Sequence, residues 1–262
     1  MSDLPRILVG VTTYEKKDYI FDECMKHIAQ MDYPKSRIDV VIVDNTKTPE
    51  YYYKLIRRGY KKVYRVERGE NSREALTKAQ NKIRRVFLDG DYDYLLFIES
   101  DLLVPPDTVK RLLSYNKDVV GSTYIIGTGN VKVPCIFVDD VVEGGFRGTR
   151  PIGIKKNSLG QKYFDEKEVM DFLSRRDKLQ QVHGVGFGCT LIARKIFLDR
   201  EDVPENDPRR KGVVFWYDIR FNDKHSDVYF YLDMSRRGVP VFVDISVVVP
   251  HHPTDWATVH DR

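Results

Sequence analysis

The sequence contains few cysteines and no long apolar run, and both absences exclude classes of protein. Cys24, Cys135 and Cys189 are odd in number, widely spaced and set among apolar residues, which predicts buried free thiols rather than a disulfide framework or a zinc site. No apolar run approaches the roughly 20 residues that a transmembrane helix needs. The first residues also lack the basic and apolar regions of a secretion signal. We therefore expect a cytoplasmic protein without a transmembrane segment.

The chain also lacks a tract of one charge, an internal repeat, a linker and a low-complexity segment. Its 43 basic and 39 acidic residues leave a formal net charge of +4, which does not indicate a nucleic-acid-binding protein but permits an anionic substrate. With 262 residues, of which 42% are hydrophobic, the chain is long enough for one large core. These features predict a single α/β domain.

The first 115 residues alternate short apolar runs with stretches of helical periodicity. The apolar runs and the helical patterns occupy, in turn, residues 6–11, 20–31, 38–43, 49–58, 62–66, 75–87, 94–101 and 107–115. Such a series predicts a mostly parallel central sheet flanked by helices, in which the carboxyl ends of the strands share one ligand crevice. Polar residues follow the apolar runs. We therefore expect four of them to lie close together at that edge of the sheet, namely Thr13, Asp44, Arg73 and Asp101.

The apolar run at 94–101 ends in two carboxylates, Glu99 and Asp101, which only Ser100 separates. Nothing in a buried core needs these two charges. On a turn they can face a single hard cation, and such a cation can neutralise a diphosphate. The alternative is a surface turn in which an aspartate caps the following helix.

From about residue 118 the chain changes to short strands and glycine-containing loops. Residues 138–162 combine five glycines with arginines and lysines, which indicates a mobile basic loop or, more simply, solvated hairpin turns. Gly184, Gly186 and Gly188 alternate before an apolar strand, so the backbone there must approach another group closely. We interpret this stretch as a bulged strand in the wall of a substrate site.

The remaining segments are an aromatic stretch, a helix and two short strands. They are expected at residues 213–218, 227–237, 240–243 and 245–249. Ser226 can cap the helix and Gly238 can end it.

His251 and His252 follow the last of these strands. Adjacent histidines at a strand end are either metal ligands or part of a polar loop. Because consecutive residues of an extended chain point to opposite sides, only one of the two is expected to bind a metal. His252 is slightly favoured.

Taken together and in this order, these motifs resemble the family 2 glycosyltransferases. The residues that carry the resemblance are Val11–Tyr14, Val43–Asn45, Arg73, Glu99–Asp101, Gly184–Arg194, Ser226–Val228 and Val248–His252. The resemblance covers most of the chain, although residues 138–162 and 199–211 have no counterpart.

The resemblance implies an α/β fold of the GT-A (Rossmann-like) type, the fold of nucleotide-diphospho-sugar transferases, with a mostly parallel central sheet flanked by helices. It also implies a single domain over residues 1–262. In that domain, about 1–115 would be the nucleotide-sugar-binding half. About 116–262 would be the acceptor-binding half, with the catalytic and metal-ligand residues.

The resemblance further implies that the acidic turn and the histidines hold a divalent cation, Mn²⁺ or Mg²⁺. Asp101 would bind the cation directly, and Glu99 would bind it through water or contact the donor sugar. His251 or His252 would complete the set, and a mixed oxygen and imidazole set suits Mn²⁺ better than Ca²⁺. Glu99 stands where the family has aspartate, which lengthens one arm of the site.

A nucleotide-sugar donor would lie against the first half of the chain. Asp44 would accept hydrogen bonds from the nucleobase, Thr13 and Tyr14 would border the base, and Arg73 would contact base or phosphate. For Arg73 the alternative is a surface arginine at a helix start. The complete implied donor set is Thr13, Tyr14, Asp44, Asn45, Arg73, Glu99, Ser100 and Asp101.

Transfer in this family inverts the anomeric carbon and needs a general base. Asp227 is the first candidate and Asp218 the second, although the family's Glu-Asp pair is here Ser226 and Asp227. In the alternative, Asp227 is only a favourable charge at a helix N-terminus. The implied acceptor-binding residues, which would otherwise belong to the core, are Gly186, Phe187, Trp216 and Tyr217.

The expected enzyme is a hexosyl or pentosyl transferase whose acceptor is a glycan, a lipid, a protein or a hydroxylated DNA base. Residues 138–162 and Arg209–Lys211 make a phosphate-bearing polymer such as DNA conceivable. A sugar nucleotidyltransferase is the first alternative, but Thr12–Lys17 lacks the glycines of its phosphate loop. A non-catalytic sugar- or nucleic-acid-binding module is the second.

Overall fold

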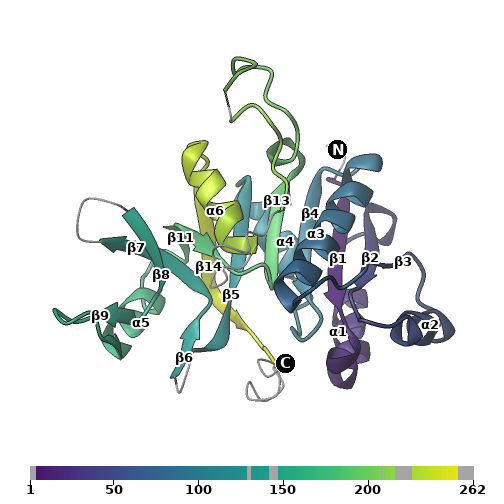
Figure 1. The fold of residues 1–262 in the computed structure, drawn as a ribbon, viewed down its shortest axis with the longest axis horizontal. Helices are drawn as coiled ribbons and strands as arrows, with labels where there is room; N and C mark the ends of the chain where they lie inside the picture. The colour runs from purple at the N-terminus through teal and green to yellow at the C-terminus, as the bar shows by residue number, and fades with distance from the viewer. Residues whose placement is uncertain (1–3, 129–130, 142–146, 208, 216–225, 253–262) are drawn as a thin grey trace.

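A computed structural model describes residues 4–128, 131–141, 147–207, 209–215 and 226–252 (Figure 1). The strands of its largest sheet are β1 (Ile7–Thr13), β2 (Ile38–Asp44), β3 (Val63–Arg65), β4 (Tyr94–Glu99), β5 (Val119–Thr128), β6 (Val131–Pro134), β11 (Leu179–Val182), β13 (Cys189–Ala193) and β14 (Val241–Val249). The α-helices within these ranges are α1 (Asp18–Ala29), α2 (Glu50–Arg57), α3 (Ser72–Asp89), α4 (Thr108–Ser114), α5 (Glu166–Leu173) and α6 (Ser226–Arg236). The strand order is β11-β14-β5-β13-β4-β1-β2-β3, with β6 paired to β5. The α/β architecture with a large central sheet is therefore as predicted.

Strands β1 to β4 form the regular part of the sheet. β1 pairs in parallel with both β2 and β4, and β2 pairs in parallel with β3. In this register Thr13 lies beside Asp44, and Thr12 lies beside Glu99. The polar residues that follow the apolar runs therefore lie along one edge of the sheet, where ligands of such sheets bind.

Helices cover both faces of these strands, which explains why the strands are continuous apolar runs. One face packs against α1 and α4 through residues such as Phe21 and Leu112. The other face packs against α3 and α6 through residues such as Phe87 and Phe230. Gly10 in β1 is required for this packing, since a Cβ atom there would lie 2.4 Å from Cγ2 of Ile83 in α3.

The second half of the chain is built differently. β13 is antiparallel to its neighbours β4 and β5, while β14 runs parallel to β5 and antiparallel to β11. A smaller sheet contains β7 (Ile136–Val141), β8 (Arg147–Pro151) and β12 (Gly184–Val185), and a separate hairpin contains β9 (Ile154–Lys156) and β10 (Lys162–Phe164). The basic segment 138–162 thus contains hairpin strands, which is the simpler of its two sequence interpretations; its residues 142–146 lie outside the described ranges. Together with α5 these hairpins form one end of the molecule, and α2 with β3 forms the other (Figure 1).

Two sequence predictions for this half are wrong in detail. The expected strands at 240–243 and 245–249 are one strand, β14, whose register shifts between Asp244 and Val248. The expected bulged strand at 182–192 is broken into β12 and β13. In β14 a register shift lies within one strand that contains both apolar runs, whereas at 182–192 a break in pairing divides one expected strand in two. Such irregularities in strand pairing leave no clear periodic signal in the sequence.

Asp244 is fully buried and holds the β14 bulge in place. Its Oδ2 accepts a hydrogen bond from Nε of Arg111 in α4 (2.6 Å), and its Oδ1 accepts one from the backbone N–H of Ser246 (2.8 Å). Its carbonyl oxygen accepts a hydrogen bond from Oγ1 of Thr123 in β5 (2.9 Å). The bulge is therefore attached to a helix on one side and to the neighbouring strand on the other.

The three cysteines are buried free thiols, as predicted. Burial raises the pKa of Cys24 to about 12 and that of Cys189 to about 11, so both are thiols at neutral pH. Within the described part of the chain, no helix combines the length and the apolar character needed to cross a membrane.

Candidate functional site

The acidic turn follows β4 and pairs with the segment that follows β14. The backbone N–H of Leu103 donates to the carbonyl oxygen of Pro250 (3.0 Å), and that of His252 donates to the carbonyl oxygen of Asp101 (2.9 Å). Leu102 and His251 form a β-bridge between these hydrogen bonds. Residues about 150 positions apart in the sequence are thereby placed side by side.

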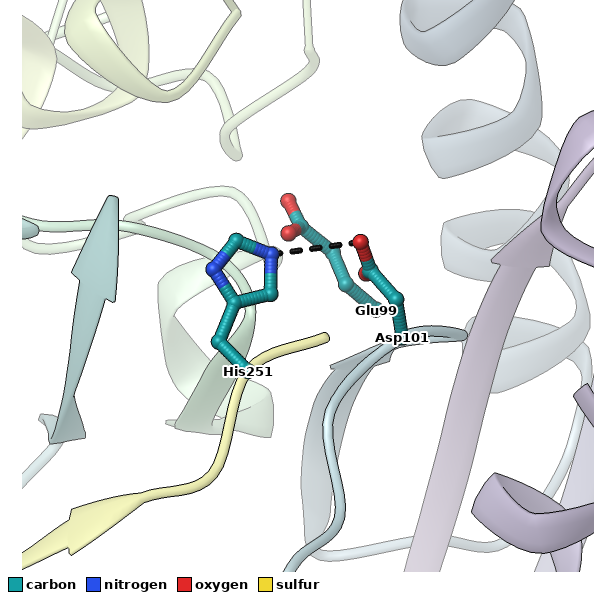
Figure 2. A group of neighbouring side chains, drawn as sticks. All are labelled: Glu99, Asp101 and His251. Atoms are coloured by element: carbon teal, nitrogen blue, oxygen red, sulfur yellow. Dashed lines mark hydrogen bonds and ion pairs between the residues drawn. The ribbon is translucent and has the colours of Figure 1, made fainter. Parts of the chain in front are cut away.

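This pairing brings the side chains of Glu99, Asp101 and His251 together, and all three point toward one another (Figure 2). Potential ligand atoms of the three lie within 4.8 Å of one another. His251 Nε2 lies 3.2 Å from Asp101 Oδ2, and His251 Nδ1 donates to the carbonyl oxygen of Ile125 (2.6 Å). The Ile125 contact fixes the ring orientation and turns Nε2 toward the carboxylates, as is usual for metal-binding histidines.

Of the two adjacent histidines, only one faces the acids. It is His251 and not the slightly favoured His252, whose side chain is exposed and whose carbonyl oxygen accepts a hydrogen bond from the Tyr19 hydroxyl. The preference for His252 is therefore corrected. The expectation that neighbouring residues of an extended segment face opposite ways is in agreement with the structure.

The two carboxylates differ in protonation. Burial, and then the charge of Asp101, raise the pKa of Glu99 to about 7. Burial alone would also raise the pKa of Asp101, but the hydrogen bond from His251 and the charge of Lys17 lower it below its ordinary value. At neutral pH Asp101 is therefore charged, whereas Glu99 holds a proton more readily than an ordinary glutamate.

Two carboxylates and an imidazole are a chemically suitable set of ligands for Mn²⁺ or Mg²⁺. The Glu99 carboxylate accepts no hydrogen bond from any residue that the structure describes. A partly buried carboxylate in this state is unfavourable unless a positive charge compensates it. The residues present therefore fit a divalent cation.

Lys17 is a site residue that sequence reasoning missed. It lies in the short 3₁₀ turn after β1, and its Nζ donates to Asp101 Oδ2. Burial lowers the pKa of Lys17, but the Asp101 carboxylate, together with Glu99 and Tyr14, raises it above its ordinary value, so the amine stays charged. The available signal was its position after β1, because β1 and β4 end at the same edge of the sheet.

The predicted nucleotide end of the site lies at the carboxyl ends of β1 and β2. Asp44 is fully buried; its Oδ1 accepts from the backbone N–H of Thr46 (2.9 Å), whereas its Oδ2 has no hydrogen-bond partner among the described residues. Burial raises the pKa of Asp44. Thr13 is its neighbour in the sheet, and the Thr13 carbonyl oxygen accepts from the N–H of Asn45 (3.0 Å). This edge therefore contains a buried acceptor atom that a ligand N–H could satisfy.

The remaining predicted donor residues lie around the same edge. Tyr14 follows β1, and the guanidinium of Arg68 lies 5.5 Å from the centre of its ring. Arg73 lies in the first turn of α3, which Asn71 caps, and Ser100 is buried in the acidic turn. Arg68 is a second residue that the sequence analysis did not identify, since it lies in an irregular segment without a motif.

Asp227 lies in the first turn of α6, as predicted. Its charge adds to burial in raising the pKa of Glu99 and Tyr124, so the Asp227 carboxylate acts electrostatically on the acidic cluster. The preceding Ser226 donates from Oγ to Oε1 of Gln80 in α3 (2.6 Å), and this bond fixes where the helix begins.

Of the predicted acceptor residues, the structure describes Gly186 and Phe187. Phe187 packs against Phe97, Phe215 and Phe230 in the hydrophobic core, with ring centres 5.0–5.4 Å apart, so it does not face a substrate. Gly186 does approach another group closely, because a Cβ atom there would lie 1.9 Å from the Tyr124 hydroxyl. Trp216, Tyr217 and Asp218 lie outside the described residues.

Gly186 and Gly188 thus pack against Tyr124, whose ring contacts His251 of the acidic cluster. The ring of Tyr124 stands edge-on to that of His251, with centres 5.6 Å apart, and its hydroxyl accepts a hydrogen bond from the N–H of Gly188 (3.1 Å). The close backbone approach that the sequence predicted is confirmed, but Gly186 and Gly188 approach this tyrosine and Gly184 approaches Tyr231.

Comparison with known proteins adds the following. The model of the family described as "Glycosyl transferase family 2" matches residues 8–199. The chain is similar to the mannosyltransferase PcManGT from Pyrobaculum calidifontis, solved in complex with GDP-Man and Mn²⁺ (15% identity, TM-score 0.56, 97% of this chain and 59% of that one). It is also similar to TarS from S. aureus in complex with UDP-GlcNAc (14% identity, TM-score 0.50, 98% and 62%). A search of curated proteins gives no match.

These likenesses show that the fold is of the expected GT-A type. The chain spans about three-fifths of the length of these two structures. The matched range 8–199 includes the acidic turn but ends before α6 and β14. Asp227 and His251, two of the predicted site residues, therefore lie in a part of the chain that the family match does not cover.

Proposed function

Since the chain belongs to glycosyl transferase family 2, we propose that it transfers a sugar from a nucleotide-diphosphate sugar to an acceptor hydroxyl, with inversion and with a divalent cation. The observation that carries this proposal is the cluster of Glu99, Asp101 and His251 at the carboxyl end of β4. The donor half would be residues 1–115 and the acceptor half residues 116–262.

Asp101 and His251, with Glu99 directly or through water, would hold the cation. When bound, Mn²⁺ or Mg²⁺ stabilises the negative charge that develops on a leaving diphosphate. Lys17 adds a second positive charge at the same place, since its Nζ already contacts Asp101. A diphosphate that approaches this edge would be within reach of that amine.

The donor nucleotide would lie across the ends of β1 and β2. The unpartnered Oδ2 of Asp44 would accept a hydrogen bond from a nucleobase N–H. Tyr14 and Arg68 would border the base, and Arg73 would contact base or phosphate. The backbone of Thr13 and Asn45 would lie beneath the bound nucleotide. The hydrogen bond from the Asn45 N–H to the Thr13 carbonyl oxygen holds these two residues together. GDP-Man and UDP-GlcNAc, which the similar structures contain, are the first donors to test.

Asp227 would act as the general base. As the acceptor oxygen bonds to the anomeric carbon, its proton passes to the Asp227 carboxylate, and the bond to the diphosphate oxygen breaks with its electron pair on the leaving group. Asp218 stays the second candidate. The proposal covers hexosyl and pentosyl transfer to an acceptor hydroxyl.

The test is a panel of nucleotide sugars incubated with Mn²⁺, with Mg²⁺ or with a chelator, with release of the nucleoside diphosphate as the readout. Slow, cation-dependent hydrolysis without an acceptor is expected from at least one donor, and the Asp101→Asn variant should lack it. Exchange of pyrophosphate into nucleoside triphosphates would instead identify a nucleotidyltransferase. Calorimetry that detects no donor binding with either cation would contradict the proposal.

A further inference from the structure

The hairpin of β9 and β10 has an ordered turn at its tip. Asn157 Oδ1 accepts hydrogen bonds from the backbone N–H groups of Leu159 (3.0 Å) and Gln161 (2.9 Å), and the N–H of Gly160 donates to the Asn157 carbonyl oxygen (2.9 Å). Gly160 has a φ of +75°, which glycine adopts easily. Asn157 and Gly160 are therefore sufficient to form this turn.

The turn presents a leucine to solvent. Leu159 is 80% exposed, more than any other large apolar side chain among the described residues. A polar residue would fit its place equally well, because the turn uses only its backbone N–H. A single exposed apolar side chain is common on protein surfaces, so Leu159 alone indicates nothing.

The strands beneath the tip carry a second unusual feature. Lys156 and Lys162 lie directly opposite each other in the antiparallel pairing. Like charges in this arrangement destabilise a hairpin. Neither lysine forms an ion pair with any described residue, whereas the neighbouring Lys155 pairs with Asp165 (2.7 Å). An anionic partner would relieve the repulsion between Lys156 and Lys162.

We propose that this hairpin tip, residues 156–162, docks on the surface of an anionic lipid bilayer. Leu159 would enter the boundary between headgroups and acyl chains, and Lys156 and Lys162 would contact lipid phosphates. Tyr163, which is 47% exposed directly after the tip, has the polar and apolar character of residues at membrane interfaces. The tip belongs to the end of the molecule opposite α2 and β3 (Figure 1).

The chemistry favours a bilayer over other anionic partners. A nucleic acid would use the two lysines but would gain little from a leucine at the tip. A stable protein interface buries about 1,000 Å² or more, which one leucine and two lysines do not provide. A bilayer needs no shape complementarity and accepts an apolar tip with a cationic base. The proposal does not depend on the transfer reaction.

The test is sedimentation of the full chain with vesicles of phosphatidylcholine alone and of phosphatidylcholine mixed with phosphatidylserine. Binding is expected only to the mixed vesicles, and it should weaken as salt increases. Leu159→Ser should lower the partition about tenfold. Lys156→Gln and Lys162→Gln should each lower it about fivefold.

Matched controls come from the rest of the surface. Leu198→Ser removes another exposed leucine, and Lys47→Gln and Lys61→Gln remove exposed lysines near α2 and β3. These variants should bind vesicles as the original protein does. Thermal unfolding of all variants checks that the hairpin substitutions leave the fold intact.

Three results would overturn the proposal. The first is the absence of vesicle binding, and the second is equal binding to neutral vesicles. The third is binding of double-stranded DNA that needs both lysines but is unchanged in Leu159→Ser, which would identify a polyanion site in place of a membrane site.

Discussion

The two halves of this chain contribute to one site by different means. In residues 4–115, parallel strands covered on both faces place Thr13, Asp44 and Glu99 along one edge of the sheet. In residues 116–252, antiparallel strands, hairpins and a bulge precede the contributing residues. His251 reaches the site through a β-bridge to Leu102, and α6 begins at a hydrogen bond from Ser226 to Gln80. Site residues are thus positioned by the sheet in one half and by long-range contacts in the other.

The largest expected effect comes from a residue of the first half. Asp101→Asn should remove cation-dependent donor binding, a greater loss than the roughly 10–100-fold that follows when only a supporting partner of a metal ligand is removed. The reason is that the residue loses a charged ligand atom and the charge that partners Lys17 and His251. Calorimetry with a nucleoside diphosphate and Mn²⁺ measures it.

Asp91→Asn, at a side chain that is 96% exposed, is the matched control and should bind normally. Undiminished cation-dependent affinity in Asp101→Asn would remove this residue from the metal site.

The next effect tests the second half alone. Asp227→Asn should slow sugar transfer by roughly 10²–10⁴-fold, as expected for loss of a general base, while donor and cation affinities stay near normal. Single-turnover transfer and calorimetry on the same preparation separate the two quantities. Asp218→Asn is the comparison variant. If Asp218→Asn abolishes transfer and Asp227→Asn does not, the base lies in the aromatic segment. A product that keeps the donor's anomeric configuration would exclude both.

A smaller effect compares neighbours within the second half. His251→Ala should weaken Mn²⁺ binding by at least the roughly 10–100-fold that the loss of a ligand's supporting partner costs, because the imidazole faces both carboxylates and would itself be a ligand. His252→Ala should leave Mn²⁺ affinity nearly unchanged, since its side chain is exposed. Competition of Mn²⁺ with a chelating dye measures both affinities. Equal, mild losses in the two variants would show that neither histidine is a ligand.

The smallest expected effect is the pH dependence of cation affinity, to which Glu99 of the first half and His251 of the second half both contribute. Because the pKa of Glu99 is raised to about 7, a proton competes with the cation below that pH, and Mg²⁺ affinity should fall by up to about tenfold per pH unit as pH decreases from 7. The raised pKa of His251 adds to the fall in the same direction. Glu99→Gln should flatten the profile between pH 6 and 7, and an unchanged profile in that variant would assign the dependence to His251.

The raised pKa of Glu99 also affects folding stability, which changes with pH in the opposite direction to cation affinity. A carboxylate whose pKa is raised on folding favours the folded state while it is protonated and loses that contribution as pH rises through the folded pKa. Without a cation, the Glu99 contribution should therefore decrease between its ordinary pKa and about 7.

What the sequence could predict follows the same division. The series β1 to β4 and the position of Glu99 and Asp101 at a strand end are local patterns, since apolar runs and their polar ends can be read residue by residue. The start of α6 at Ser226 and its end just before Gly238, where φ is +68°, are local in the same way.

The choice between His251 and His252 could not be read from the sequence. Alternation along a strand shows that the two side chains face opposite sides. The register shift between Asp244 and Val248 determines which of them faces the acidic turn. Lys17 and Phe187 were misjudged for a similar reason. Spacing indicates that a side chain or a backbone must meet a partner, but only the assembled fold identifies the partner.

The contact between Lys17 and Asp101 makes folding of this protein independent of metal binding. Small zinc domains remain unfolded until their metal arrives. Here an amine of the chain itself already balances Asp101, so folding does not wait for a cation. Under the proposed function, protein made without manganese or magnesium would be folded but inactive, and adding the ion would restore activity without new synthesis.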